Sequence, residues 1–244
     1  MTSIDCKCIE ILKKHGSPTI SDAIELFKVR PQNEGFLHSS IQSLFPELPP
    51  MVGYAVTMKF KSSEEVEQLP RSNEFGRQVE ALLKMPSPRV VVIEDVDECG
   101  VGAAFGEMCA TTYMQFGCAG IVCSGGARDT EAIHQKKLPL FAKSRNVSHG
   151  YPQIYALNVP VNVGGVTVNP GDLLHGDADG IVTIPSELAP QVAEFCEKVI
   201  ATEEEYLDYL NSGDVTVAGV DEAAQRFGTS KMELAKEILR KSAG

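Results

Sequence analysis

Three charged residues at a fixed spacing carry the clearest chemical signal in the sequence: Glu107 and, after twenty intervening residues, the pair Arg128-Asp129. Asp129 offers a hard oxygen ligand for Mg²⁺ or Mn²⁺, and one carboxylate can suffice because such ions also keep waters and take oxygens from a substrate. Arg128 can donate a planar fork of hydrogen bonds to a carboxylate or to a developing enolate. Glu107 could hold a water on the metal. This set favours a short 2-oxo acid whose carbonyl the metal polarises.

Two apolar runs predict the strands that position these residues. Val90 to Ile93 is β-branched and suits a buried strand, and Ala119 to Cys123 is a second apolar run. Gly125-Gly126 is expected to turn the chain, so that Arg128 and Asp129 emerge together beyond it. If the strands are parallel neighbours, both turns open on the edge of the sheet where α/β proteins usually bind ligands.

A helix is expected to begin near Glu107, because Gly106 punctuates the chain before the segment Met108 to Phe116. Free backbone N–H groups at Glu107 and Met108 would then bind one end of a small anion at the helix N-terminus. We therefore expect Gly106, Glu107, Met108 and Arg128 to bind the substrate.

At these residues the sequence resembles the RraA-like family, which includes the class II 4-hydroxy-4-methyl-2-oxoglutarate aldolases. The family pattern of an acidic residue, about twenty positions and Arg-Asp reads here GEMCATTYMQFGCAGIVCSGGARDTEA, from Gly106 to Ala132. Three further landmarks are similar to the family in the same order, and such ordered agreement is more specific than the motif alone. They are Thr19-Ile20-Ser21-Asp22-Ala23 as a helix start, Gly53 to Thr57 as the first core strand, and Val168 to Asp172 through Asp179 to Val182 as a hairpin. The resemblance covers roughly residues 4 to 210.

The resemblance implies an α/β protein with the RraA-like swivelling β/β/α domain and flanking helices. A chain of 244 residues with 43% hydrophobic content is long enough for one large domain with a substantial core. We therefore expect a single RraA-like domain over residues 1–244, with its core in residues 4–210 and a C-terminal helical extension in residues 211–244.

The resemblance also implies a metal-dependent lyase of the class II aldolase or decarboxylase type, with Mg²⁺ or Mn²⁺ at Asp129. Cleavage or decarboxylation of a small 2-oxo acid would leave a pyruvate enolate, stabilised by the metal and Arg128. Water organised by Glu107 would move the proton, since no lysine is obviously placed for Schiff-base chemistry. The same family includes proteins that bind and inhibit an endoribonuclease. A non-catalytic regulator is therefore the alternative, beside a family lyase that acts on a different polar substrate.

A long helix is expected from Ser186 to Asn211, where an apolar face recurs at helical spacing. This face consists of Leu188, Val192, Phe195 and Val199. In the resembling aldolases, a glutamate late in this helix reaches the metal site of the neighbouring subunit. Position along the chain favours Glu204 for this catalytic role, the register equally allows Glu203 or Glu205, and a solvated acidic turn is the alternative. The resemblance thus implies a homotrimer or a dimer of trimers, with sites at subunit interfaces.

Composition disfavours several kinds of partner. The net charge of −11 disfavours nucleic acid, whose phosphates need Lys and Arg, and it repels anionic membranes. No apolar run approaches membrane-spanning length, and Asp5 and Glu10 interrupt the N-terminus, so no signal peptide is expected. Seven cysteines without CxxC spacing suit reduced thiols in a cytoplasmic protein.

Two further motifs favour structural roles over ligand sites. The run Gly100-x-Gly102-x-x-x-Gly106 resembles a dinucleotide-binding loop, but Asp97-Glu98 would face the pyrophosphate, which disfavours a nicotinamide enzyme. Residues 223–230 are similar to a helix-turn-helix in which Gly228 ends the first helix. So acidic a chain favours instead a packed helical hairpin or an oligomer contact there.

The histidines at 134, 149 and 175 could be metal ligands or bases, although isolated histidines are more often structural. His175 alone lies near a family landmark, at a position where the family pattern favours a small or aliphatic residue.

Overall fold

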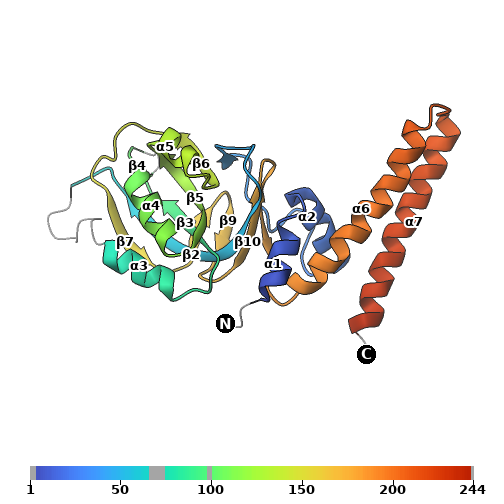
Figure 1. The fold of residues 1–244 in the computed structure, drawn as a ribbon, viewed down its shortest axis with the longest axis horizontal. Helices are drawn as coiled ribbons and strands as arrows, with labels where there is room; N and C mark the ends of the chain where they lie inside the picture. Colours follow the sequence, from blue (N-terminus) through green and yellow to red (C-terminus); the bar gives the residue numbers. More distant parts are fainter. Residues whose placement is uncertain (1–3, 66–74, 98–100, 243–244) are drawn as a thin grey trace. The chain divides into compact units, whose positions relative to one another are not determined.

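The computed structural model describes residues 4–65, 75–97 and 101–242, and the chain divides into two compact units (Figure 1). The first unit comprises Met1–Ser17 and Gly35–Ser186, and the second comprises Pro18–Glu34 and Glu187–Gly244. The described strands belong to the first unit, whereas the described secondary-structure elements of the second are helices. The single domain expected over residues 1–244 stays a prediction.

A mixed sheet, nine-stranded over the described residues, forms the centre of the first unit. Its strands follow the order β1-β6-β5-β3-β2-β10-β11, with β4 paired to β5 and β7 paired to β2, while β8 and β9 form a separate ribbon. The strands are β1 (Gln42–Ser43), β2 (Met51–Lys61), β3 (Arg89–Asp95), β4 (Ala103–Phe105), β5 (Cys118–Ala127), β6 (Leu140–Arg145), β7 (Gln153–Leu157), β8 (Val161–Val163), β9 (Val166–Val168), β10 (Leu173–Asp177) and β11 (Gly180–Ile184).

The centre of the sheet is parallel because helices connect its strands. Helix α3 (Phe75–Leu83) lies between β2 and β3 in the chain, α4 (Glu107–Gln115) between β3 and β5, and α5 (Thr130–Gln135) between β5 and β6. Each of these strand pairs is parallel, as crossover connections require. A short helix, α1 (Cys6–Leu12), precedes the sheet and buries Cys8, Ile9 and Leu12.

Alternation of side chains along β3 shows how the two faces of the sheet are covered. Val91 and Ile93 pack in a cluster with residues of α3, α4 and α5. Val90 and Val92 point to the opposite face, where they pack with the β8–β9 ribbon. Helices thus cover one face and a β-ribbon the other, which confirms the predicted α/β fold.

The elements expected around the motif are present. The runs Val90 to Ile93 and Ala119 to Cys123 lie in β3 and β5, which are parallel neighbours. Gly53 to Thr57 lies in β2, and β10 and β11 form the expected hairpin. The landmark beginning at Thr19 lies inside α2 (Ser17–Leu26), which begins two residues earlier at the Ser17-Pro18 step. Pro is favoured in a first helical turn, where its missing N–H is not needed.

The predicted turn at Gly125-Gly126 is wrong. Strand β5 continues through both glycines to Ala127, with an irregular register against β6. Gly125 instead permits close packing of two strands, because a Cβ there would overlap the Asp95 carboxylate at the end of β3. The turn comes later, at Asp129, whose φ is 55°.

The second unit is built on α6 (Ala189–Asn211) and α7 (Val217–Ser242), which lie side by side (Figure 1). On the apolar face expected for α6, Val192, Phe195 and Val199 are buried. The helix begins at Ala189, three residues later than predicted, so Ser186 lies outside it. No helix among the described residues is long and apolar enough to cross a membrane.

The predicted helix end at Gly228 is wrong, since α7 passes through this residue without interruption. An interior glycine costs a helix only about 1 kcal/mol relative to alanine, so the packing of the two helices outweighs it. Lys198 of α6 contributes by pairing with Glu237 of α7 at 2.6 Å. The segment is therefore part of a helical hairpin and not a helix-turn-helix.

Candidate functional site

The residue that precedes helix α4 is a glycine and supplies no side-chain cap. Gly106 is the N-cap residue and has no side chain to accept a hydrogen bond from the first turn. The Asp129 carboxylate takes this role, because its Oδ2 accepts a hydrogen bond from the Glu107 N–H at 3.1 Å. The expected free N–H group at Glu107 is therefore occupied, which corrects that part of the predicted anion site.

Strand pairing brings Asp129 to this position. Strand β4 pairs with the end of β5, and the Arg128 N–H donates to the Phe105 carbonyl at 3.1 Å. Asp129 then adopts a left-handed conformation, with φ 55° and ψ 32°, which Asp tolerates better than most residues. Although it stands at the N-cap of α5, its side chain makes no cap bond there and reaches α4 instead.

Gly106 is required at this junction for steric reasons. A Cβ on Gly106 would overlap the Asp129 carboxylate and would lie 3.0 Å from Cγ of Arg128. The Arg-Asp pair therefore packs directly onto the backbone at the head of α4, and a side chain at Gly106 would displace it.

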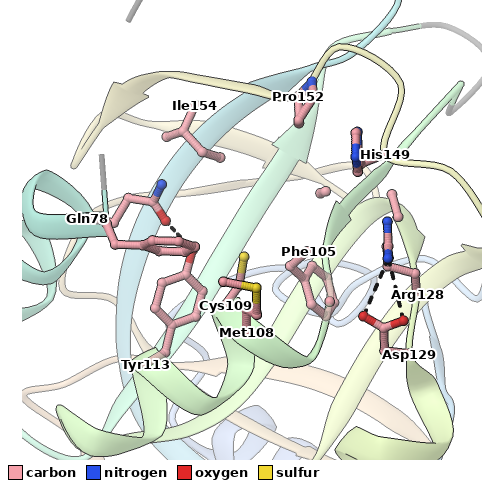
Figure 2. A pocket seen from close by; sticks show the side chains of 14 residues that line it. Gln78, Phe105, Met108, Cys109, Tyr113, Arg128, Asp129, His149, Pro152 and Ile154 are labelled. Carbon is pink, nitrogen blue, oxygen red and sulfur yellow. Dashed lines mark hydrogen bonds and ion pairs between the residues drawn. The ribbon is translucent and has the colours of Figure 1, made fainter. Parts of the chain in front are cut away.

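Arg128 and Asp129 face each other at the edge of a pocket (Figure 2). Nε of Arg128 lies 3.4 Å from Oδ2 and 3.5 Å from Oδ1 of Asp129, which is a loose ion pair. The two side chains are 35% and 39% exposed, so solvent and ligands can reach both. Both contacts of Arg128 with Asp129 use Nε, and within the described part of the chain its terminal guanidinium nitrogens have no hydrogen-bond partner. They are available to an anion.

The Glu107 carboxylate is held by a lysine outside the Arg-Asp pair. Its Oε1 is paired with Nζ of Lys136 at 3.0 Å, and Glu107 is not among the described residues that line the pocket, whereas its neighbours Gly106 and Met108 are. The structure thus joins the Glu107 backbone to Asp129, while the predicted catalytic role of its carboxylate stays a prediction.

The pocket has a volume of about 610 Å³, which lies within the range of small-molecule sites. It extends from Arg128 and Asp129 across α4 towards α3 and β7 (Figure 2). Its lining consists of Phe75, Gln78, Ala103, Ala104, Phe105, Gly106, Met108, Cys109, Tyr113, Arg128, Asp129, His149, Pro152 and Ile154.

Several lining residues carry no catalytic signal in the sequence. Tyr113 is buried on α4 and donates a hydrogen bond from its hydroxyl to Oε1 of Gln78 on α3. Burial raises the pKa of Tyr113 well above its ordinary value and also raises the pKa of Cys109, so both stay protonated at neutral pH. The spacing of Gly106, Cys109 and Tyr113 along α4 places them on one helix face, which is a signal that could have indicated a shared wall.

Of the three histidines considered as ligands or bases, only His149 lines the pocket. His149 lines the pocket near Arg128, and its Nδ1 lies 2.7 Å from the Gly150 carbonyl, so this nitrogen carries the proton (Figure 2). His134 pairs with Glu47 outside the pocket. His175 is fully buried in β10, where it contacts Ser17 Oγ at 2.9 Å and the Leu12 carbonyl at 3.2 Å. The structure gives His175 a packing environment and does not bring it to the pocket.

Glu204 lies in the second unit, exposed on α6. Its neighbour Glu205 pairs with Arg226 at 3.6 Å, and Glu203 is partly buried beside Asp22, which together raise the pKa of Glu203. Within the described residues, Glu204 makes no ion pair or hydrogen bond. It is the least engaged of the three glutamates, which is compatible with the role predicted for it.

Other candidate ligand sites find little support. Over residues 4–65, 75–97 and 101–242, no group of three or more His, Cys, Asp or Glu side chains is placed to hold a metal. The six described cysteines are free thiols. Gly100, Glu98 and Cys99 of the dinucleotide-like loop lie outside the described residues.

The fold and the Arg-Asp pair at the N-terminus of α4 can be compared with those of known protein families. The sequence model of the RraA-like family, described as Aldolase/RraA, matches residues 17–183. The chain belongs to the RraA-like family, as its motif predicted.

Individual relatives are distant. A candidate 4-hydroxy-4-methyl-2-oxoglutarate aldolase of Halalkalibacterium halodurans is 33% identical over 116 residues, which cover 47% of this chain and 55% of that protein. Protein DlpA of Legionella pneumophila is 24% identical over 206 residues. That match covers 81% of this chain but only 30% of DlpA, so this chain corresponds to a minor part of the Legionella protein.

A solved structure shares the fold. The RraAS2 protein of Streptomyces coelicolor, described as an unusual member of the RNase ES inhibitor RraA family, superimposes with a TM-score of 0.66 at 24% identity. The match covers 83% of this chain and 97% of RraAS2.

Proposed function

We propose that the protein is a divalent-metal-dependent lyase that cleaves or decarboxylates a small 2-oxo acid through a pyruvate enolate. One observation carries the proposal: Arg128 and Asp129 stand together at the head of α4, on the wall of a pocket of about 610 Å³. A guanidinium with free terminal nitrogens suits a carboxylate or enolate, and an adjacent exposed carboxylate suits a hard cation. The name of the Halalkalibacterium relative supports the aldolase reading.

The residues present fit Mg²⁺ or Mn²⁺ held by one protein carboxylate. Asp129 is 39% exposed, and only its Oδ2 is engaged by the helix, while its contact with Arg128 is loose. Because no group of three or more His, Cys, Asp or Glu side chains gathers among the described residues, oxygens of substrate and water would complete the coordination, which Mg²⁺ accepts. When bound, the metal would act as a Lewis acid on the 2-oxo group.

The residues of the chain would then have separate roles in binding and proton transfer. Arg128 would bind the substrate carboxylate and stabilise negative charge as the enolate develops, which is the step where such a donor contributes most. Gly106 and the Met108 N–H would bind the anion at the N-terminus of α4. Glu107, steadied by Lys136, would orient the water that moves the proton.

We further propose a homotrimer or dimer of trimers in which Glu204 of the partner subunit completes each site. Glu204 is exposed and without a partner in the described part of its own chain, so it is free to serve a neighbour.

A panel of 2-oxo acids tests the lyase. Purified protein should release pyruvate from oxaloacetate or from 4-hydroxy-2-oxo acids with Mg²⁺ or Mn²⁺, and chelation should abolish the release. Turnover that persists after exhaustive chelation would refute the metal mechanism.

A non-catalytic regulator is the second candidate function. It is supported by the RraAS2 neighbour, which is described as a member of an RNase inhibitor family. Absence of turnover across the whole panel, together with inhibition of a purified ribonuclease, would favour this function over the lyase.

A further inference from the structure

The two ends of the pocket differ in chemistry. Arg128, Asp129 and His149 lie at one end, whereas Gln78 and Tyr113 lie at the other (Figure 2). Cys109 and Ile154 flank Gln78 and Tyr113 at this second end, and the apolar side chains of Phe105, Met108 and Pro152 form the wall between the two ends.

The positive charge is confined to the first end. Among the described residues that line the pocket, Arg128 is the only Arg or Lys, and His149 is drawn at the same end of the pocket (Figure 2). An anionic head group is therefore drawn to Arg128. A pocket of about 610 Å³ leaves room beyond a three-carbon 2-oxo acid head for a further substituent.

The second end offers no charged partner for a negative charge among the described residues. Its described lining contains no Arg, Lys or His, and the Tyr113 hydroxyl already donates to Gln78 Oε1, so the remaining polar groups of this wall are uncharged. The Cys109 thiol is a weak donor, and burial raises its pKa, so it stays uncharged. A carboxylate placed here would lose water without gaining a charged partner, and the net charge of −11 would add to the penalty.

We propose that this second end, the distal wall of Gln78, Cys109, Tyr113 and Ile154, selects substrates whose far end is uncharged and apolar. Among 4-hydroxy-2-oxo acids that undergo C3–C4 cleavage, the substrate class is then a 2-oxo monocarboxylate with a short aliphatic branch, rather than a dicarboxylate. This inference rests on the proposed function for the identity of the head group, and it concerns only what lies beyond that group.

The reaction expected for such a substrate balances without a further reactant. In 4-hydroxy-2-oxopentanoate the C3–C4 bond breaks, its electron pair stays on C3 as the enolate, and the C4 hydroxyl loses its proton to become acetaldehyde. The enolate takes a proton at C3 and leaves as pyruvate. The matched dicarboxylate, 4-hydroxy-2-oxoglutarate, differs only in having a carboxylate in place of the methyl group, and it would yield glyoxylate.

Binding tests the distal wall independently of turnover. The probes are 2-oxopentanoate and 2-oxoglutarate, which lack the 4-hydroxyl group and cannot undergo this cleavage. Calorimetry on the full chain with Mn²⁺ should give a Kd at least about tenfold lower for 2-oxopentanoate, because the dicarboxylate must desolvate a second charge. Equal affinity, tighter binding of 2-oxoglutarate, or binding of neither would overturn the inference.

A charge variant at Ile154 sharpens the test. Ile154→Lys adds a cation to the distal wall, and its stem can lie along the apolar surface, so it should cut the preference for 2-oxopentanoate at least about fivefold. Ile154→Met, which is uncharged and of similar length, should keep the preference, and thermal melts would confirm that both variants fold. An unchanged preference in a folded Ile154→Lys protein would contradict the role of this wall.

Turnover separates this inference from the proposed function. Cleavage of 4-hydroxy-2-oxopentanoate with a kcat/KM at least about tenfold above that of 4-hydroxy-2-oxoglutarate supports both. The reverse order supports the lyase and overturns the distal wall. Selective binding of 2-oxopentanoate without any cleavage supports the wall and overturns the lyase.

Discussion

Substitution of Gly106 by alanine should damage the site through a single steric contact. The φ of −143° and ψ of −162° at Gly106 are open to alanine, so backbone strain does not contribute. The new Cβ would lie 3.0 Å from Cγ of Arg128, where carbons prefer about 3.5–4.0 Å, and it would overlap the Asp129 carboxylate. The Arg-Asp pair must then move by a distance on the order of 1 Å, and such a misplacement can lower turnover by about 10²-fold.

The same displacement should weaken the fold measurably. Loss of the Asp129 cap on α4 would lower the free energy of unfolding by about 1 kcal/mol, which urea titration followed by circular dichroism can detect. Gly228→Ala is the matched control, because a Cβ there meets nothing within 4 Å and alanine favours the helix interior by about 1 kcal/mol. A Gly106→Ala protein with kcat/KM within about threefold of wild type would refute the steric argument.

Three further predictions address the charged groups. Asp129→Asn should weaken Mn²⁺ binding in calorimetry, whereas Arg128→Ala should leave it largely intact and lower turnover on the order of 10²-fold; nearly full activity of Arg128→Lys would contradict a bidentate role. Asp129→Asn and Glu204→Gln chains, each poorly active alone, should regain about a quarter of wild-type activity when equal amounts are reassembled as trimers, and no recovery in verified mixed trimers would remove Glu204 from the site. Because burial raises the pKa of Cys109, its alkylation, followed by mass spectrometry, should be slow at neutral pH and accelerate above the ordinary thiol pKa; rapid reaction at pH 7 would contradict this.

The strands could be predicted because a buried strand has an apolar local sequence. A parallel strand covered on both faces needs apolar residues throughout, and Val90 to Ile93 satisfies this without reference to the rest of the chain. Glycine is less informative. The sequence of Gly125-Gly126 is compatible with a turn and with two strands in close contact, and only the position of Asp95 decides between them.

The sequence predicted which residues form the site better than it predicted the contacts between their side chains. The rule that parallel strands place their following turns on one sheet edge brings Arg128 and Asp129 beside the head of α4. The pairing of Glu107 with Lys136 and of Tyr113 with Gln78 joins side chains from different elements. No local pattern encodes such contacts, because they depend on how the helices pack.

The use of Asp129 as a helix cap bears on its proposed use as a metal ligand. A helix N-terminus favours a negative charge, and the Glu107 N–H fixes one oxygen of the carboxylate, so its orientation is set before any ligand arrives. Asparagine can keep this bond through its amide oxygen and also tolerates a φ of 55°, so Asp129→Asn removes the charge and spares the cap. Asp129→Ala removes both. If Asp129→Asn unfolds as readily as Asp129→Ala, the charge itself holds α4; if it remains as stable as wild type yet loses Mn²⁺, the two roles of this carboxylate are separable.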